Sequence, residues 1–175
     1  MFQPTQRELQ SVSEALGWSG ICVGPVRQMG TDVWPVISMG RSHGSRVGAD
    51  EVELVGCLVA GEASAALVAS ASLFAGYAPR AIVISGEAPL EVMVDAALLD
   101  QGVVAVAADM VEVLGLPGPR VQPRTREPRG SVAGANGAID VGRERQEDGG
   151  QPSFKGEADL KAKALAALLA VADRQ

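Results

Sequence analysis

The order of hydrophobic and polar positions predicts one helix and three strands at the start of the chain. Residues 6–16 carry apolar side chains at helical spacing, and Gly17 stands where a helix commonly ends. Apolar, β-branched runs then predict strands at three places, namely residues 20–26, 32–39 and 52–60. Pro35 indicates that the second strand is an edge strand or a bulged one. The third is almost entirely apolar after Glu53, which is typical of a strand covered on both faces.

The pattern of the next sixty residues alternates between helices and buried strands. We expect a small-residue helix before Pro79, a second helix that starts at Pro89, and a short third helix at residues 109–114. The apolar runs between them predict strands at residues 80–86 and 103–108. Two such strands joined by a helix favour a right-handed parallel βαβ unit. The predicted fold class is therefore α/β, a three-layer-like sandwich around a mixed sheet.

The pattern changes again after Leu116 and divides the chain into three parts. Residues 1–117 form the predicted α/β core, and residues 118–155 are rich in Pro, Gly and Arg without an apolar period, as expected of a flexible linker. Residues 156–175 return to a helical pattern with an amphipathic stripe, formed by Leu160, Ala164, Leu168 and Val171. This stripe requires a covering surface, which its own domain, a second copy or another protein would provide.

Charge is unevenly distributed over these three parts. The chain carries a formal net charge of -6, and residues 1–117 hold 5 basic and 13 acidic residues. All three lysines, Lys155, Lys161 and Lys163, lie in the last 21 residues. Any chemistry of residues 1–117 therefore proceeds without a lysine from that segment. An acidic core, in a chain with 3% aromatic residues, is also unlike a dedicated DNA-binding domain or a stacking platform for single strands.

Several classes of protein and site lack their sequence signals. The apolar runs are shorter than the roughly 20 residues of a membrane span, and the polar start does not read as a secretory signal. Two cysteines, Cys22 and Cys57, are too few for a disulfide framework, so we expect a cytoplasmic protein. With His43 as the single histidine, the chain has no zinc-binding spacing. The serines beside His43 do not make a catalytic triad, which is recognised by spatial arrangement.

Nucleotide binding is disfavoured at both strand-to-helix turns. These turns read VAGEAS and ISGEAP, and neither is a glycine-rich phosphate loop. Glu62 and Glu87 occupy the positions where a phosphate would approach, and their charge repels it. The same charge is favourable at the positive end of a helix, which is the interpretation we prefer for both glutamates.

The elements of residues 7–114 follow one another in a recognisable order, with the segments GTDVWPVISMG, VELVGCLVAGE and APRAIVISGEAPLEVMVDAALLDQGVVAVAADMVEVL. This succession resembles the restriction-endonuclease-like superfamily, in particular its Mrr-type branch. The resemblance implies that Asp32 matches the aspartate that opens the second strand and that Glu8 matches the acidic residue of the first helix. It also implies Glu/Gln-x-Lys on the third strand, where carboxylates hold a divalent metal and the lysine orients water.

The third strand departs from that pattern, because Glu53 is followed by Leu54 and Val55 and no lysine. We therefore expect a non-catalytic member without a cofactor, which acts as a binding or regulatory module. The alternative is a small Mg²⁺-dependent nuclease or DNA-processing enzyme with an atypical site built from Glu8, Asp32 and Glu53. For Asp32, a purely structural role as a turn-capping residue also stays open.

The linker contains one basic cluster, formed by Arg120, Arg124, Arg126 and Arg129. These arginines make a weak, non-specific contact with DNA phosphates one interpretation, and a merely solvated linker the other. A third functional hypothesis is accordingly a DNA-associated accessory protein. The partners expected from sequence are thus a protein or a second copy bound through the C-terminal helix, and weakly bound DNA, but no membrane.

Overall fold

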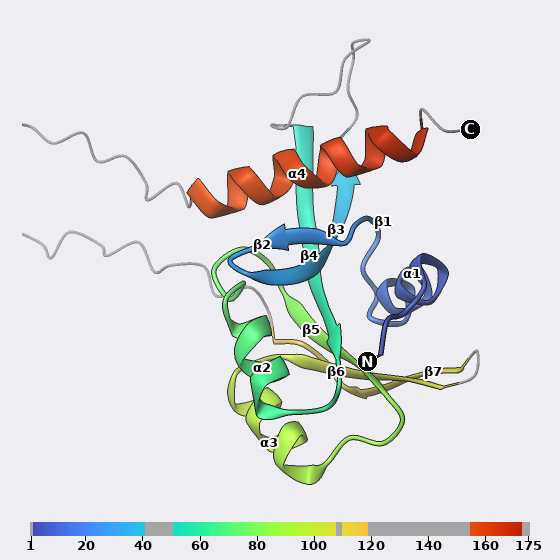
Figure 1. The fold of residues 1–175 in the computed structure, drawn as a ribbon, viewed down its shortest axis with the longest axis vertical. Helices are drawn as coiled ribbons and strands as arrows, with labels where there is room; N and C mark the ends of the chain where they lie inside the picture. The colour runs from blue at the N-terminus through green and yellow to red at the C-terminus, as the bar shows by residue number, and fades with distance from the viewer. Residues whose placement is uncertain (1, 41–50, 108–109, 119–154, 173–175) are drawn as a thin grey trace, which may run out of the picture.

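A computed structural model describes residues 2–40, 51–107, 110–118 and 155–172 of the chain. Its elements follow the order α1 (Gln6–Ala15), β1 (Ile21–Cys22), β2 (Val26–Gln28), β3 (Thr31–Met39), β4 (Val52–Gly61), α2 (Ala65–Ser72), β5 (Arg80–Ser85), α3 (Leu90–Leu98), β6 (Gly102–Ala107), β7 (Met110–Gly115) and α4 (Lys155–Ala172). The strands form one curled, mixed sheet in the order β1-β3-β4-β5-β6-β7, with β2 paired to β3 (Figure 1). The predicted α/β class with a mixed sheet is confirmed.

The sheet has a parallel centre and antiparallel flanks. β4 pairs in parallel with β5, and β5 with β6, so the expected parallel βαβ arrangement is present. β3 runs antiparallel to β4, and β7 runs antiparallel to β6. Pro35 does not place β3 at an edge. Instead the register shifts between Val36 and Ile37, one residue beyond the proline, so the bulged alternative is correct.

Two predicted elements differ from the structure. The strand expected at residues 20–26 is divided into β1 and β2 by Gly24 and Pro25, because proline has no N–H for a strand ladder. The helix predicted at residues 109–114 is wrong, since Met110–Gly115 is the strand β7. Val111 and Val113 face one side and Glu112 the other, and only two residues separate β7 from β6, as in a hairpin.

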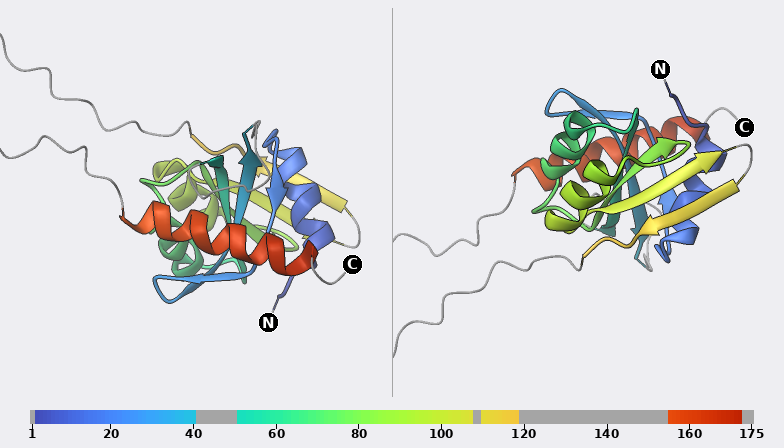
Figure 2. Two further views of the ribbon diagram at one scale, coloured as in Figure 1. Left: turned by 90° about the horizontal axis from the view of Figure 1, so that it is seen from above. Right: turned by 90° about the horizontal axis from the view of Figure 1, so that it is seen from below.

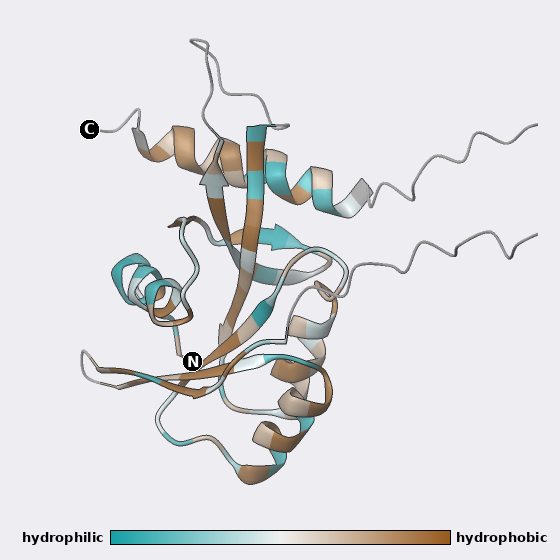
Figure 3. Ribbon diagram, turned by 180° about the vertical axis from the view of Figure 1, so that it is seen from behind, coloured by the Kyte–Doolittle hydropathy of each residue, from teal (hydrophilic) through white to brown (hydrophobic). Residues whose placement is uncertain are grey.

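Helices cover both faces of the sheet and create two apolar cores. α2, α3 and α4 lie over one face, where Phe74, Ile82 and Leu160 are buried. α1 lies over the other face and buries Leu9 and Val12 against it. The views from above and below show this three-layer arrangement (Figure 2). Coloured by hydropathy, the central strands are apolar along most of their length, while much of α1 is polar (Figure 3).

The C-terminal helix α4 docks on its own domain. Leu160 and Ala164 are fully buried in the core under β2, β3 and β4. Gly156 lies so close to Tyr77 that a Cβ atom there would stand 1.8 Å from the tyrosine hydroxyl. Of the predicted stripe, the first half is thus covered by the chain itself, while Val171 is 59% exposed. None of the helices in the described ranges is both long and apolar enough to cross a membrane.

Candidate functional site

The first of the three predicted carboxylates, Glu8, serves the N-terminus of α1. Its Oε2 accepts hydrogen bonds from Thr5, from the backbone N at 2.6 Å and from Oγ1 at 2.8 Å. The Thr5 Oγ1 in turn accepts from the Glu8 backbone N at 3.2 Å, which completes a capping box. These bonds, the backbone one first, lower the pKa of Glu8 from its ordinary value. Glu8 therefore has a structural partner for its charge.

The other two carboxylates, Asp32 and Glu53, lie near opposite ends of β3. Asp32 is directly opposite Arg27 in the β2–β3 ladder and forms an ion pair with it at 3.0 Å. Both side chains are more than half exposed, so this pair contributes at most about 1 kcal/mol. Glu53 is opposite Ser38, which is six residues farther along β3 and hence about 20 Å away at the rise of a strand.

The predicted acidic residues are therefore not brought together. Within the described ranges, no group of three or more His, Cys, Asp or Glu side chains is arranged to hold a metal ion. One lysine does contact the α/β core, but it belongs to the C-terminal helix α4. Lys163 Nζ donates to Gln28 Oε1 at 2.7 Å and pairs with Asp159 at 2.7 Å, so it is anchored beside the hairpin that carries Asp32.

The remaining sequence candidates are either buried or beyond the described ranges. Cys22 and Cys57 are buried thiols, and burial raises the pKa of Cys22 to about 12 and also raises that of Cys57. Neither thiol is therefore poised as a nucleophile. His43 and the four linker arginines, Arg120, Arg124, Arg126 and Arg129, lie outside the described residues.

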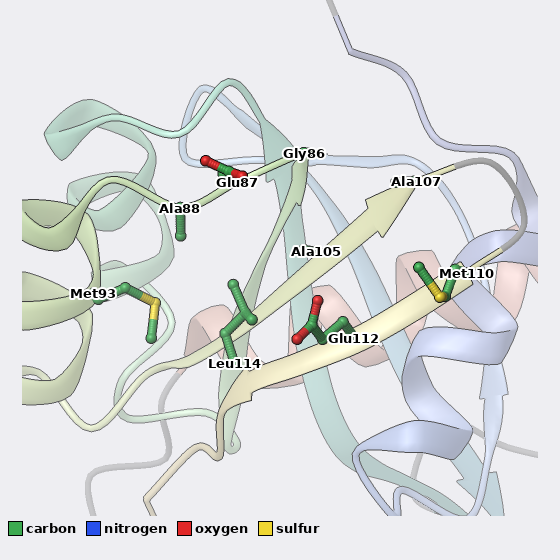
Figure 4. Close-up of a pocket in the computed structure, with 9 residues that line it drawn as sticks. All are labelled: Gly86, Glu87, Ala88, Met93, Ala105, Ala107, Met110, Glu112 and Leu114. Atoms are coloured by element: carbon green, nitrogen blue, oxygen red, sulfur yellow. The ribbon is translucent and has the colours of Figure 1, made fainter.

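A cleft of about 540 Å³ opens beside the carboxyl ends of β5 and β6. Its floor is the α3-facing side of β6 and β7, which includes Ala105, Glu112 and Leu114. Met93 of α3 and Glu87 from the loop after β5 form the opposite wall (Figure 4). In open α/β sheets, ligands bind preferentially outside the carboxyl ends of the strands. The cleft combines apolar walls with two carboxylates, which suits a group that has an apolar stem and a cationic head.

Along one side, this cleft is bounded by the last strand of the sheet. Among the described residues, no strand pairs with the outer edge of β7. Met110 at its start is 66% exposed, and Leu116 just beyond its end is 72% exposed. An unpaired edge presents a row of backbone N–H and C=O groups that an added strand can bind.

The opposite edge of the sheet, at β1, is closed by side chains. Gln10 accepts a hydrogen bond from the Cys22 backbone N at 3.0 Å and donates to the Gly20 backbone O at 3.2 Å. Gln6, one turn earlier on α1, donates to the Cys22 backbone O. These two glutamines occupy the backbone groups that face away from β3, so β1 is not open to another strand. Beside them lies a groove of about 880 Å³, which α4 closes with Leu168 and Val171.

Comparison with known proteins found no similar protein. No protein-family model, no curated protein and no solved structure matches the chain.

Sequence reasoning missed the cleft because it assigned residues 109–114 to a helix. A helix there would have left β6 as the sheet edge and given the cleft no second strand. The alternation of Val111, Glu112 and Val113 was the available signal for a strand. In so short a segment, that alternation competes with a helical interpretation of the same apolar residues.

Proposed function

We propose that this chain is a non-catalytic domain of restriction-endonuclease-like type that acts through binding, as an interaction or regulatory module. The observation that carries the proposal is the dispersal of Glu8, Asp32 and Glu53 over α1, β3 and β4. A two-carboxylate metal site needs ligands that share one ion at about 2 Å each. Asp32 at one end of β3 and Glu53 on β4 beside the other end of β3 do not meet that requirement.

The surroundings of β4 support the same proposal. Leu54, Cys57 and Val59 are buried on one face of this strand, and Leu58 on the other. The resembled family is expected to place a metal-binding carboxylate and a lysine on this strand. Here the carboxylate position, Glu53, is exposed, and the lysine position holds Val55, a half-buried apolar residue that packs against the core under α1. The strand therefore offers no cation to orient a water molecule.

A nuclease assay tests the proposal. The full chain is incubated with supercoiled plasmid, linear DNA and methylated DNA in the presence of Mg²⁺ or Mn²⁺, with Asp32→Ala run in parallel. We expect no cleavage above that of the Asp32→Ala protein on any substrate. Cleavage that depends on the metal and disappears in Asp32→Ala would overturn the proposal in favour of the atypical enzyme.

A further inference from the structure

We propose that the outer edge of β7 and the adjoining cleft bind an extended peptide segment of a partner protein, in which a lysine or arginine is flanked two residues away on each side by an apolar residue. The segment adds a strand to the sheet beside β7. This inference names the partner chemistry of the binding module proposed above and rests on that function.

The backbone of β7 provides the first reason. Six residues, Met110–Gly115, are paired with β6 on one side, and no described strand pairs on the other. The two edges of the sheet differ, because Gln6 and Gln10 occupy the outward-facing backbone groups of β1, whereas no strand of the described ranges pairs with the outer edge of β7. Proteins commonly protect edge strands, so an edge left open beside an apolar cleft indicates a binding surface.

The side chains of β7 define what the added strand must carry. Met110, Glu112 and Leu114 face the cleft, whereas Val111 and Val113 pack toward α1. Cross-strand neighbours on one face stand about 5 Å apart. The residue beside Glu112 is therefore favoured as Lys or Arg, and its neighbours two positions away lie beside Met110 and Leu114, which favours apolar side chains.

Charge selects a basic peptide over a second copy of this chain. Glu87 joins Glu112 in the lining of the cleft, and none of the described residues that line it is basic. Residues 1–117 carry 13 acidic against 5 basic residues, so two copies of the core repel each other. A basic peptide segment is attracted by the negative potential of the same acidic residues.

A peptide titration followed by amide NMR of the full chain tests the inference. The probe is a seven-residue, end-blocked peptide in which leucine, lysine and leucine alternate with threonine. We expect the largest shifts at the amides of β7 and Met93. The same peptide with glutamate in place of lysine should bind at least about tenfold more weakly, because an attractive cross-strand pair becomes a repulsive one.

Backbone pairing is tested separately from side-chain contact. Two further peptides carry N-methyl groups, one on the leucine and lysine positions and one on the threonine positions. Alternate N–H groups of a strand point to opposite edges, so one of these peptides should lose binding and the other should keep it. Equal binding by both would overturn strand addition.

Protein variants complete the test. Glu112→Arg should weaken binding of the lysine peptide by about tenfold, because the cross-strand charge pair becomes repulsive. Asp95→Arg, the same change of charge at an exposed position of α3 outside the cleft lining, should leave the affinity within about twofold. The inference would be overturned if the two variants had equal effects or if the lysine peptide did not bind. It would also be overturned if the shifts at β7 depended on protein concentration alone, which would indicate a second copy. The nuclease assay on the same preparation reports independently on the proposed function, so the two failures are distinguishable.

Discussion

The docking of α4 makes a quantitative prediction about Leu160. This side chain is fully buried in the core shared with β2, β3 and β4, although 36 residues outside the described ranges separate α4 from β7 and its following turn. Replacing it with alanine removes three carbon atoms, which costs about 2.4 kcal/mol in transfer free energy at about 0.8 kcal/mol per methylene-sized group. The cavity left behind adds to this loss, so we expect Leu160→Ala to lower the free energy of unfolding by about 3 kcal/mol.

Leu169 provides the matched control, since it belongs to the same helix but is 54% exposed. Leu169→Ala should cost about 0.5 kcal/mol, as is common for surface substitutions. Urea denaturation of both variants measures the difference, and in a thermal scan Leu160→Ala should melt roughly 6–12 °C below the parent chain. If both variants lose the same stability, or if Leu160→Ala stays within about 0.5 kcal/mol of the parent, α4 is not part of this core.

Three further predictions concern buried contacts. Gly56→Ala should destabilise the fold by about 1–3 kcal/mol in urea denaturation, because the added Cβ would stand 2.4 Å from the ring of Trp18, and an unchanged midpoint would contradict that packing. Cys22 and Cys57 should react with a thiol reagent at pH 8 only as fast as the chain unfolds. Because burial raises the pKa of both thiols, they ionise at lower pH in the unfolded chain, so the free energy of unfolding should fall as the pH rises above about 8.5. Rapid labelling of the native chain would disprove their burial. Gln10→Ala should accelerate hydrogen exchange of the Cys22 amide, which loses its acceptor, and an unchanged exchange rate would argue against the closed β1 edge.

Local pattern was sufficient for most of the elements. The apolar runs of β4, β5 and β6 are strong signals because a strand covered on both faces excludes polar residues, and the structure buries them on both faces. The amphipathic period of α1 and the restart of a helix after the linker are equally local. The helix prediction for residues 109–114 was wrong because the apolar residues of so short a segment fit both the helical and the strand period. Only pairing with β6 selects the strand.

The candidate site depended much more on tertiary structure. The resemblance to the restriction-endonuclease-like superfamily implied that Glu8, Asp32 and Glu53 could form one site. The distance along β3 separates two of them, and capping by Thr5 and pairing with Arg27 engage Glu8 and Asp32. The cleft was not predictable either. Its lining comes from the loop after β5, from α3 and from two strands, and no sequence period joins such distant positions.

The distribution of lysines shows which properties the sequence determines and which the tertiary structure determines. Sequence alone establishes that residues 1–117 are acidic and contain no lysine, that the α/β pattern ends near Leu116, and that an amphipathic helix follows the linker. It left open which surface covers that helix, because an apolar stripe specifies burial without specifying a partner. The tertiary structure places Leu160 in the core and Lys163 beside Gln28 of β2, so the folded domain has a lysine that its own segment lacks. It also decides which sheet edge is left without a partner strand among the described residues, because edge pairing depends on contacts between segments that are distant in the chain.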